Sequence, residues 1–191
     1  ESAATQYFVD RVNEYWLTEF RFDGYRFDLS KGFTQTNSGT DVGAWSNYDA
    51  SRIALLKRMS DQIWLTDPDA YVILEHFAAN SEEKELSDYG MMLWGNLNYN
   101  YCEAAMGWLS NSNFSSISYI NRGWTNPHLI GYFESHDEER SMFRNLTYGN
   151  TANPDYNIRT LGVALRRVQQ PGQRWTQRAA NCRFSVHRAR A

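Results

Sequence analysis

The stretch Tyr71-Val72-Ile73-Leu74-Glu75 is a short, almost entirely apolar run that ends on a carboxylate. Such a run is typical of a strand that is buried on both faces, as the strands of parallel sheets are. A Pro-containing segment, residues 67–69, separates it from a helical pattern upstream. The stretch therefore predicts a parallel sheet covered by helices, with an acidic side chain at one strand's C-terminal end.

Helical patterns and further short strands alternate on both sides of this stretch. Apolar residues recur at helical spacing over residues 3–19, and again after Asp49 or Ser51, either of which can cap a helix. Further strands are expected at 25–29, 91–97 and 129–133, a long loop at 32–48, and further helices at 101–109 and 156–168. This alternation predicts an α/β fold of about four βα units. A complete (β/α)8 TIM barrel has eight strands and usually about 250 residues, so the chain would form a partial barrel.

Length and composition narrow the class of protein. With 191 residues, of which 42% are hydrophobic, the chain fits a single globular domain with one core. Its net charge of -3 argues against nucleic acid as a partner, because such binding needs a basic face. No apolar run approaches the roughly 20 residues of a membrane span. The two cysteines indicate neither a disulfide framework nor a zinc cluster.

The C-terminal stretch differs in charge from the rest of the chain. Residues 156–191 contain no Asp or Glu, and arginines recur along them while the helical pattern weakens after Val168. We therefore expect residues 1–168 to form the partial barrel, as the catalytic domain, and residues 169–191 to be an Arg-rich tail outside this fold. A basic tail that binds an anionic partner is the alternative.

Asp28 lies at the C-terminal end of the strand predicted at residues 25–29. Alternate side chains of a strand share a face, so Arg26 and Asp28 point the same way, and Arg26 would keep Asp28 ionised by lowering its pKa. An ionised carboxylate at a strand's C-terminal end suits a glycosidase nucleophile. A purely structural Arg–Asp pair is the alternative.

Glu75 ends the opening stretch in the same way. Partial burial at the end of an apolar strand would raise its pKa, so that it keeps a proton near neutral pH. This is the requirement for a general acid. The alternative is a glutamate that merely caps the strand at the surface.

A third acidic group, Ser135-His136-Asp137, follows the strand predicted at 129–133. His136 can hydrogen-bond a sugar hydroxyl, and Asp137 can face developing positive charge. Metal binding is less favoured, because no second His lies at ligand spacing. The residues that follow, 138–140, are interpreted as a solvated charge run.

At these residues the sequence resembles the α-amylase family of retaining glycoside hydrolases. The segment Gly24-Tyr25-Arg26-Phe27-Asp28-Leu29-Ser30-Lys31 looks like the family's fourth-strand motif, which carries an arginine and the nucleophilic aspartate. Glu75 matches the fifth-strand acid/base glutamate, and Ser135-His136-Asp137 looks like the seventh-strand motif. The motifs agree in order and spacing, and the resemblance covers roughly residues 3–168.

The resemblance implies a (β/α)8 barrel that cleaves α-1,4-glucosidic bonds of starch or related α-glucans by double displacement. Asp28 would be the nucleophile, Glu75 the general acid/base and Asp137 the transition-state stabiliser. Substrate contacts are expected from Arg26, Lys31 and His136. Four aromatic residues on loops or strand ends could stack on sugars, although core packing explains each about as well: Trp45, Tyr48, Trp94 and Tyr99.

Parts of the family pattern are missing from this chain. They include the third-strand motif, whose Asp and His grip the sugar, as well as the first three strands and the eighth. The family usually has a His after the lysine and often binds calcium through its carbonyl, whereas this chain has Gly32. Most other calcium ligands are also missing, so no cofactor and no metal ligand is assigned, and calcium stays an open alternative.

Several functional interpretations follow from the resemblance. The first is an α-amylase-type hydrolase, and the second is an α-1,6-glucosidase, neopullulanase or transglycosidase of the same family. The third is a catalytically incompetent fragment that binds glucan. Exposed edges of a partial barrel would favour a homo-oligomer. No signal peptide is recognised, but family members that digest polymeric starch are commonly exported, so we expect an extracellular protein.

Overall fold

The computed structural model describes residues 2–150 and 152, which form an α/β fold. Its strands are β1 (Gly24–Phe27), β2 (Tyr71–Leu74), β3 (Met92–Asn96) and β4 (Leu129–Tyr132). They form one sheet in the order β1-β2-β3-β4, and each pair of neighbours is parallel. The helices interleaved with them are α1 (Ala3–Phe20), α2 (Ala50–Thr66), α3 (Asn80–Tyr89), α4 (Asn98–Met106) and α5 (Ser141–Tyr148).

The predicted α/β class with four parallel strands is confirmed. The long loop expected at 32–48 contains two short 3-10 helices, Ser30–Phe33 and Val42–Ser46. Helices α3 and α5 were not predicted, because both are short and rich in polar residues. The helix predicted at 156–168, the tail at 169–191 and Cys182 lie outside the described residues.

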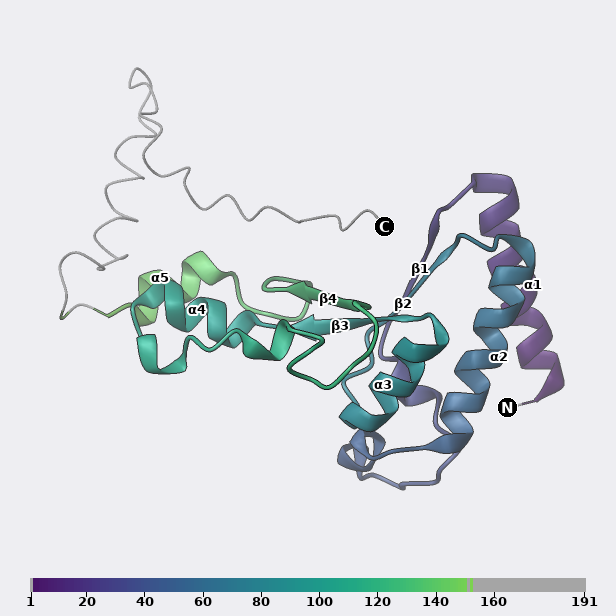
Figure 1. The fold of residues 1–191 in the computed structure, drawn as a ribbon, viewed down its shortest axis with the longest axis horizontal. Coiled ribbons are helices and arrows are strands. Elements are labelled where there is room, and N and C mark those ends of the chain that lie inside the picture. Colours follow the sequence, from purple (N-terminus) through teal and green to yellow (C-terminus); the bar gives the residue numbers. More distant parts are fainter. Residues whose placement is uncertain (1, 151, 153–191) are drawn as a thin grey trace, which may run out of the picture.

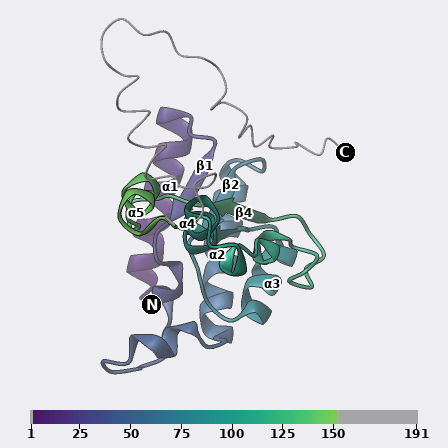
Figure 2. The same ribbon diagram turned by 90° about the vertical axis from the view of Figure 1, so that its left-hand side faces the viewer.

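Four helices lie in two groups of two along the sheet, and α3 packs against α2 and β3 (Figure 1). Helices α1 and α2 pack side by side next to β1 and β2, and α4 and α5 pack against each other near β3 and β4. Turned by 90°, the second group is nearest the viewer, with the sheet behind it (Figure 2). The sheet thus joins both groups into one body.

The hydrophobic core lies between α2, α3 and the middle strands. Its fully buried members are Leu56, Leu74, Leu86, Met91 and Leu93. Burying apolar surface stabilises the fold by roughly 25 cal/mol per Å². In β2, the opening stretch of the sequence, Val72 and Leu74 are buried, whereas Ile73 is half-buried and Tyr71 is exposed, so the expected burial on both faces holds for one face only.

Local backbone requirements determine where two of the elements begin. Gly24 starts β1 with a φ of 151°, and a Cβ at this position would overlap the backbone of Tyr71 at the start of β2. Asp49 caps α2, since its Oδ1 accepts hydrogen bonds from the backbone N–H groups of Ser51 and Arg52 at 2.9 and 3.2 Å. These residues fix how the chain enters β1 and leaves the loop that follows it.

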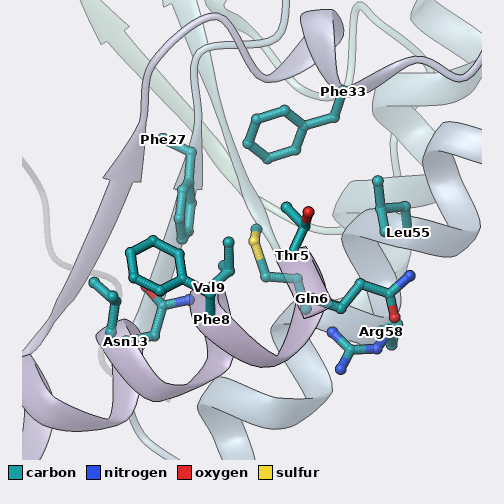
Figure 3. A pocket seen from close by; sticks show the side chains of 11 residues that line it. Thr5, Gln6, Phe8, Val9, Asn13, Phe27, Phe33, Leu55 and Arg58 are labelled. Atoms are coloured by element: carbon teal, nitrogen blue, oxygen red, sulfur yellow. The ribbon is translucent and has the colours of Figure 1, made fainter. Parts of the chain in front are cut away.

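A pocket of about 380 Å³ lies between α1, β1 and α2, and its lining is mainly apolar (Figure 3). Phe27 of β1, Phe8 of α1 and Phe33 line it. Because alternate side chains of a strand point to opposite faces, Phe27 and Arg26 lie on opposite sides of β1. The pocket is therefore separate from the carboxylates that follow β1 and β2.

Candidate active site

The two carboxylates predicted to act together lie at the same edge of the sheet. Asp28 follows β1 and Glu75 follows β2, and the register pairs Phe27 with Leu74 immediately before them. The backbone N–H of Glu75 donates to the carbonyl of Phe27 at 3.0 Å, and the N–H of Ser30 donates to the carbonyl of Glu75 at 2.9 Å. Parallel pairing therefore brings these two acids together from positions far apart in the chain.

Arg26 connects the two carboxyl groups. Its Nη1 donates to Oδ1 of Asp28 and its Nη2 donates to Oε2 of Glu75. The guanidinium carbon also lies 4.0 Å from the centre of the Trp94 ring, so one face of the cation rests on an indole. The face shared by Arg26 and Asp28, as predicted, thus carries a single charged cluster.

The environments of Asp28 and Glu75 move their pKa values in opposite directions. The hydrogen bond from Arg26 lowers the pKa of Asp28, whose side chain is 66% exposed. Burial raises the pKa of Glu75, whose side chain is only 8% exposed. Asp28 is therefore held as the anion, while Glu75 retains its proton to higher pH than an ordinary glutamate.

His136 and Asp137 reach this cluster from the loop after β4. The Nε2 atom of His136 lies 3.5 Å from Oδ1 of Asp28 and 3.5 Å from Oδ1 of Asp137. Both side chains are more than half exposed. The three predicted catalytic carboxylates and His136 thus gather at one end of the sheet.

Glu138 is not part of a solvated charge run, so that prediction is wrong for this residue. Its Oε2 accepts the backbone N–H of Ser135 at 2.9 Å and the hydroxyl of Ser135 at 2.5 Å. Its Oε1 accepts Nδ2 of Asn96, at the end of β3, at 2.6 Å. Glu138 therefore ties the loop that carries His136 and Asp137 to the sheet. The Ser-x-x-Glu spacing, as in a capping box, is a sequence signal for this contact.

Two residues just after the carboxylate positions have left-handed backbone conformations. Leu29 has a φ of 43° and Phe77 a φ of 51°. Such conformations cost non-glycine residues on the order of 1–3 kcal/mol and concentrate at functional sites. At Leu29 the turn also lets the backbone N–H reach Oε2 of Glu75 at 3.3 Å. The strain accompanies a contact to the buried carboxyl group.

The remaining predicted substrate-contacting residues divide into two groups. Lys31 lies near the cluster, with its Nζ 3.4 Å from the carbonyl of Phe77, and Trp94 packs against Arg26. Trp45 is half-buried in the loop after β1, where its indole N–H donates to Ser38. Tyr48 points instead toward α3, where its hydroxyl donates to Glu85 at 2.8 Å. Tyr99 is exposed at the start of α4.

The described residues do not fit a calcium or other metal centre. They contain no group of three or more His, Cys, Asp or Glu side chains arranged to hold a metal ion. The carbonyl of Gly32 would be one oxygen ligand, whereas calcium takes about six to eight. Cys102, the cysteine within the described part of the chain, is a buried free thiol. No step of a mechanism is therefore assigned to a metal here.

Comparison with known proteins adds no family assignment. No family model matches the chain, and no curated protein matches it. Among the described helices, none is both long and apolar enough to cross a membrane.

Proposed function

We propose that this chain carries the catalytic residues of a retaining glycoside hydrolase of the α-amylase type. Its substrates would be α-1,4-linked glucans such as starch, and its four parallel strands would form part of a (β/α)8 barrel. One observation carries the proposal: Arg26 joins an exposed carboxylate, whose pKa is lowered, to a buried carboxyl group, whose pKa is raised. Paired carboxyl groups with separated pKa values are what acid and nucleophile roles require.

In the proposed mechanism the two carboxyl groups act in sequence. Asp28 attacks the anomeric carbon while Glu75 protonates the glycosidic oxygen, so the bond to the leaving sugar breaks and a covalent glycosyl-enzyme forms. Glu75, now ionised, removes a proton from water, which attacks the same carbon and releases Asp28. Asp137 would stabilise the positive charge that develops on the sugar ring, and His136 would bind a sugar hydroxyl.

Binding of glucan without hydrolysis is a second candidate function. Asp28, Asp137 and His136 are each more than half exposed in the described part of the chain. Electrostatic stabilisation of a transition state is weaker in a site open to water. An open site therefore favours binding over turnover. The other bond specificities of the family, including α-1,6 cleavage and transglycosylation, would share the same carboxylates.

The test is release of reducing sugar from soluble starch by the whole chain and by Asp28→Asn and Glu75→Gln. We expect hydrolysis by the unaltered chain, its loss in Asp28→Asn, and a kcat about 10²–10⁴-fold lower in Glu75→Gln, the usual contribution of a general acid. Asp69→Asn, at an exposed position before β2, is the matched control and should keep full activity. Hydrolysis that persists in Asp28→Asn would contradict the proposal. Retention on insoluble starch without hydrolysis would favour the binding function.

A further inference from the structure

A buried ion pair lies beneath the loop that follows β1. The side chains of Arg52 on α2 and Glu82 on α3 have no exposed surface, and Nε of Arg52 lies 2.7 Å from Oε1 of Glu82. Removing two charges from water costs several kcal/mol per ion, so such a pair persists only when its hydrogen bonds are satisfied. The proposed mechanism uses neither residue.

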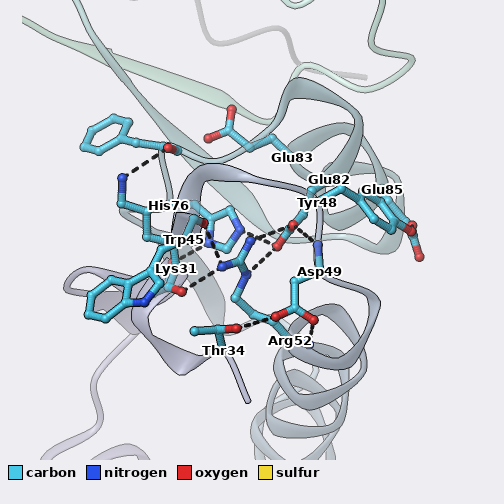
Figure 4. Close-up of polar contacts among 12 residues, drawn as sticks. Lys31, Thr34, Trp45, Tyr48, Asp49, Arg52, His76, Glu82, Glu83 and Glu85 are labelled. Atoms are coloured by element: carbon cyan, nitrogen blue, oxygen red, sulfur yellow. Dashed lines mark hydrogen bonds and ion pairs between the residues drawn. The ribbon is translucent and has the colours of Figure 1, made fainter. Parts of the chain in front are cut away.

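The guanidinium of Arg52 contacts the loop more than it contacts the two helices. Its Nη1 donates to the carbonyls of Lys31 and Trp45, both at 2.8 Å, and its Nη2 donates to the carbonyl of Asn47 at 2.9 Å. Oε2 of Glu82 accepts Nη2 at 2.7 Å and the backbone N–H of Asp49 at 2.9 Å. The pair therefore holds the loop of residues 31–49 at four backbone positions (Figure 4).

The same pair is connected to the backbone of Glu75. Oε1 of Glu82 lies 2.7 Å from Nε2 of His76, and Nδ1 of His76 lies 2.8 Å from the hydroxyl of Ser30. That hydroxyl in turn donates to the carbonyl of Glu75 at 3.1 Å. One buried network thus contacts both the loop and the backbone carbonyl of the proposed acid, Glu75.

We propose that Arg52 and Glu82 are positioning residues, which set the place of Lys31 and Trp45 relative to Glu75 and thereby shape the sugar-binding loop. The expected effect on hydrolysis rests on the proposed function, whereas the effect on the loop does not. An ion pair that only joined α2 to α3 would not need three loop carbonyls as acceptors of one guanidinium. Because the pair acts through the backbone of the loop, it differs from residues that touch the substrate.

Four variants separate positioning from stabilisation. Arg52→Met and Glu82→Gln each leave one partner buried without its counterpart, so both should lose stability. Arg52→Lys keeps the charge but lacks the planar fork that serves several acceptors. Arg52→Met combined with Glu82→Met removes both charges, which is often neutral for stability. The matched control is Arg58→Met, which removes an ion pair between α2 and Asp10 of α1.

The first measurement is amide hydrogen exchange over residues 31–49, read beside the urea unfolding midpoint, and it needs no activity. We expect the double variant to regain most of the midpoint lost by Arg52→Met while its loop exchanges roughly tenfold faster than in the unaltered chain. Arg58→Met should leave loop exchange unchanged. If loop exchange returns to the unaltered rate together with the midpoint, the pair only stabilises the fold and the proposal is overturned. If Arg52→Met does not fold, Arg52→Lys and the double variant decide the same question.

The second measurement is hydrolysis of a maltooligosaccharide as a function of pH. Misplacing substrate-binding groups can cost about a hundredfold, so we expect kcat/KM of the double variant to fall by that order, with both pH limits unchanged. If the double variant has the same kcat/KM as Arg58→Met although its loop exchanges faster, the position of the loop does not affect hydrolysis, and this part of the proposal is contradicted. If the unaltered chain does not hydrolyse glucan, the proposed function fails, whereas loop exchange still decides whether the pair positions the loop.

Discussion

At the scale of single residues, Arg26 and unequal burial together account for the opposite pKa shifts of two acids. It is in contact with both Asp28 and Glu75, yet only Asp28 ends with a lowered pKa, because burial outweighs the nearby cation at Glu75. The pKa values of two carboxyl groups of similar intrinsic acidity are thereby shifted in opposite directions. This difference is the physical basis of the nucleophile and acid roles proposed for them.

A pH profile of activity follows from these two shifts. In the proposed mechanism, activity requires ionised Asp28 and protonated Glu75. It should therefore fall as pH drops through the pKa of Asp28, below the usual value of about 3.9, and as pH rises through the pKa of Glu75, above the usual value of about 4.3. The measurement is kcat/KM on a maltooligosaccharide across this range. If activity is lost on the alkaline side with an apparent pKa below that of an ordinary glutamate, Glu75 is not the general acid.

Replacement of Arg26 tests the origin of the shifts without any activity. In Arg26→Met both carboxyl groups lose a neighbouring cation, so the pKa values of Asp28 and Glu75 should both rise. Carboxyl carbon NMR titration measures them directly. Arg11→Met, which removes an exposed ion pair with Glu14 on α1, is the control and should leave both values in place. If the pKa of Asp28 is the same in Arg26→Met as in the unaltered chain, a group other than Arg26 keeps Asp28 ionised.

At the scale of elements, the start of α2 depends on Asp49. Besides capping the helix, its Oδ2 accepts the hydroxyl of Thr34 and, at 3.1 Å, that of Thr36. Burial alone would raise its pKa, but these hydrogen bonds and those from Ser51 and Arg52 hold the pKa well below the usual range. Asp49→Ala should lower the free energy of unfolding by about 1–2 kcal/mol, measured by urea titration.

The control for this prediction is Asp41→Ala, which removes the cap of a 3-10 helix in the exposed loop and should cost less. The stability that Asp49 contributes should be present above its unfolded pKa of about 3.9 and lost as pH falls toward its folded value. If Asp49→Ala and Asp41→Ala lower the free energy of unfolding equally, the cap of α2 stabilises the fold no more than the cap of the 3-10 helix does.

The loop after β4 depends in the same way on Glu138. Removing a charged acceptor shared by Ser135 and Asn96 should cost about 1–3 kcal/mol in Glu138→Ala, measured as the free energy of unfolding in urea. Glu139→Ala is the matched control, because Glu139 is half exposed and pairs with Arg144 at 3.4 Å, a contact worth roughly 0–1 kcal/mol. If Glu138→Ala and Glu139→Ala lower the free energy of unfolding by similar amounts, Glu138 behaves like a solvated surface residue.

At the scale of the whole molecule, the sheet ends in two strands, β1 and β4, each with one neighbour among the described residues. The C-terminal end of α1 also exposes a cluster of contacting aromatic rings, Tyr15, Trp16, Phe20 and Phe22. Unpaired strand edges and exposed apolar patches both favour association.

We therefore expect the chain to self-associate, as the partial-barrel prediction implied. Sedimentation velocity should show mass that rises with concentration over the micromolar range. Phe20→Lys, which places a charge in the aromatic cluster, should shift the distribution toward the monomer, while Leu65→Lys, an exposed apolar residue on α2 outside that cluster, should not. A monodisperse monomer with a sharp, cooperative thermal transition would argue against open edges.

Local pattern determined much of the fold. The strands at β2 and β4, the helices α1 and α2 and the Asp49 cap follow from apolar spacing and capping chemistry, which act over a few residues. The positions of Asp28 and Glu75 at strand ends follow from the same patterns, whereas Asp137 lies four residues beyond the strand predicted at 129–133. Helices α3 and α5 escaped prediction because both are short, and the buried acidic residues Glu82 and Glu83 of α3 owe their burial to neighbours elsewhere in the fold.

The sequence by itself thus determined the four strands, the helices α1 and α2, and the places of Asp28 and Glu75 at strand ends. Only the tertiary structure decided that Arg26 is shared by two carboxyl groups, that Glu138 holds a loop to Asn96, and that Tyr48 points toward Glu85. Arg52 reaches Glu82 and three loop carbonyls for the same reason. These contacts join residues that are up to tens of positions apart, and the burial that shifts a pKa exists only once distant segments have packed together.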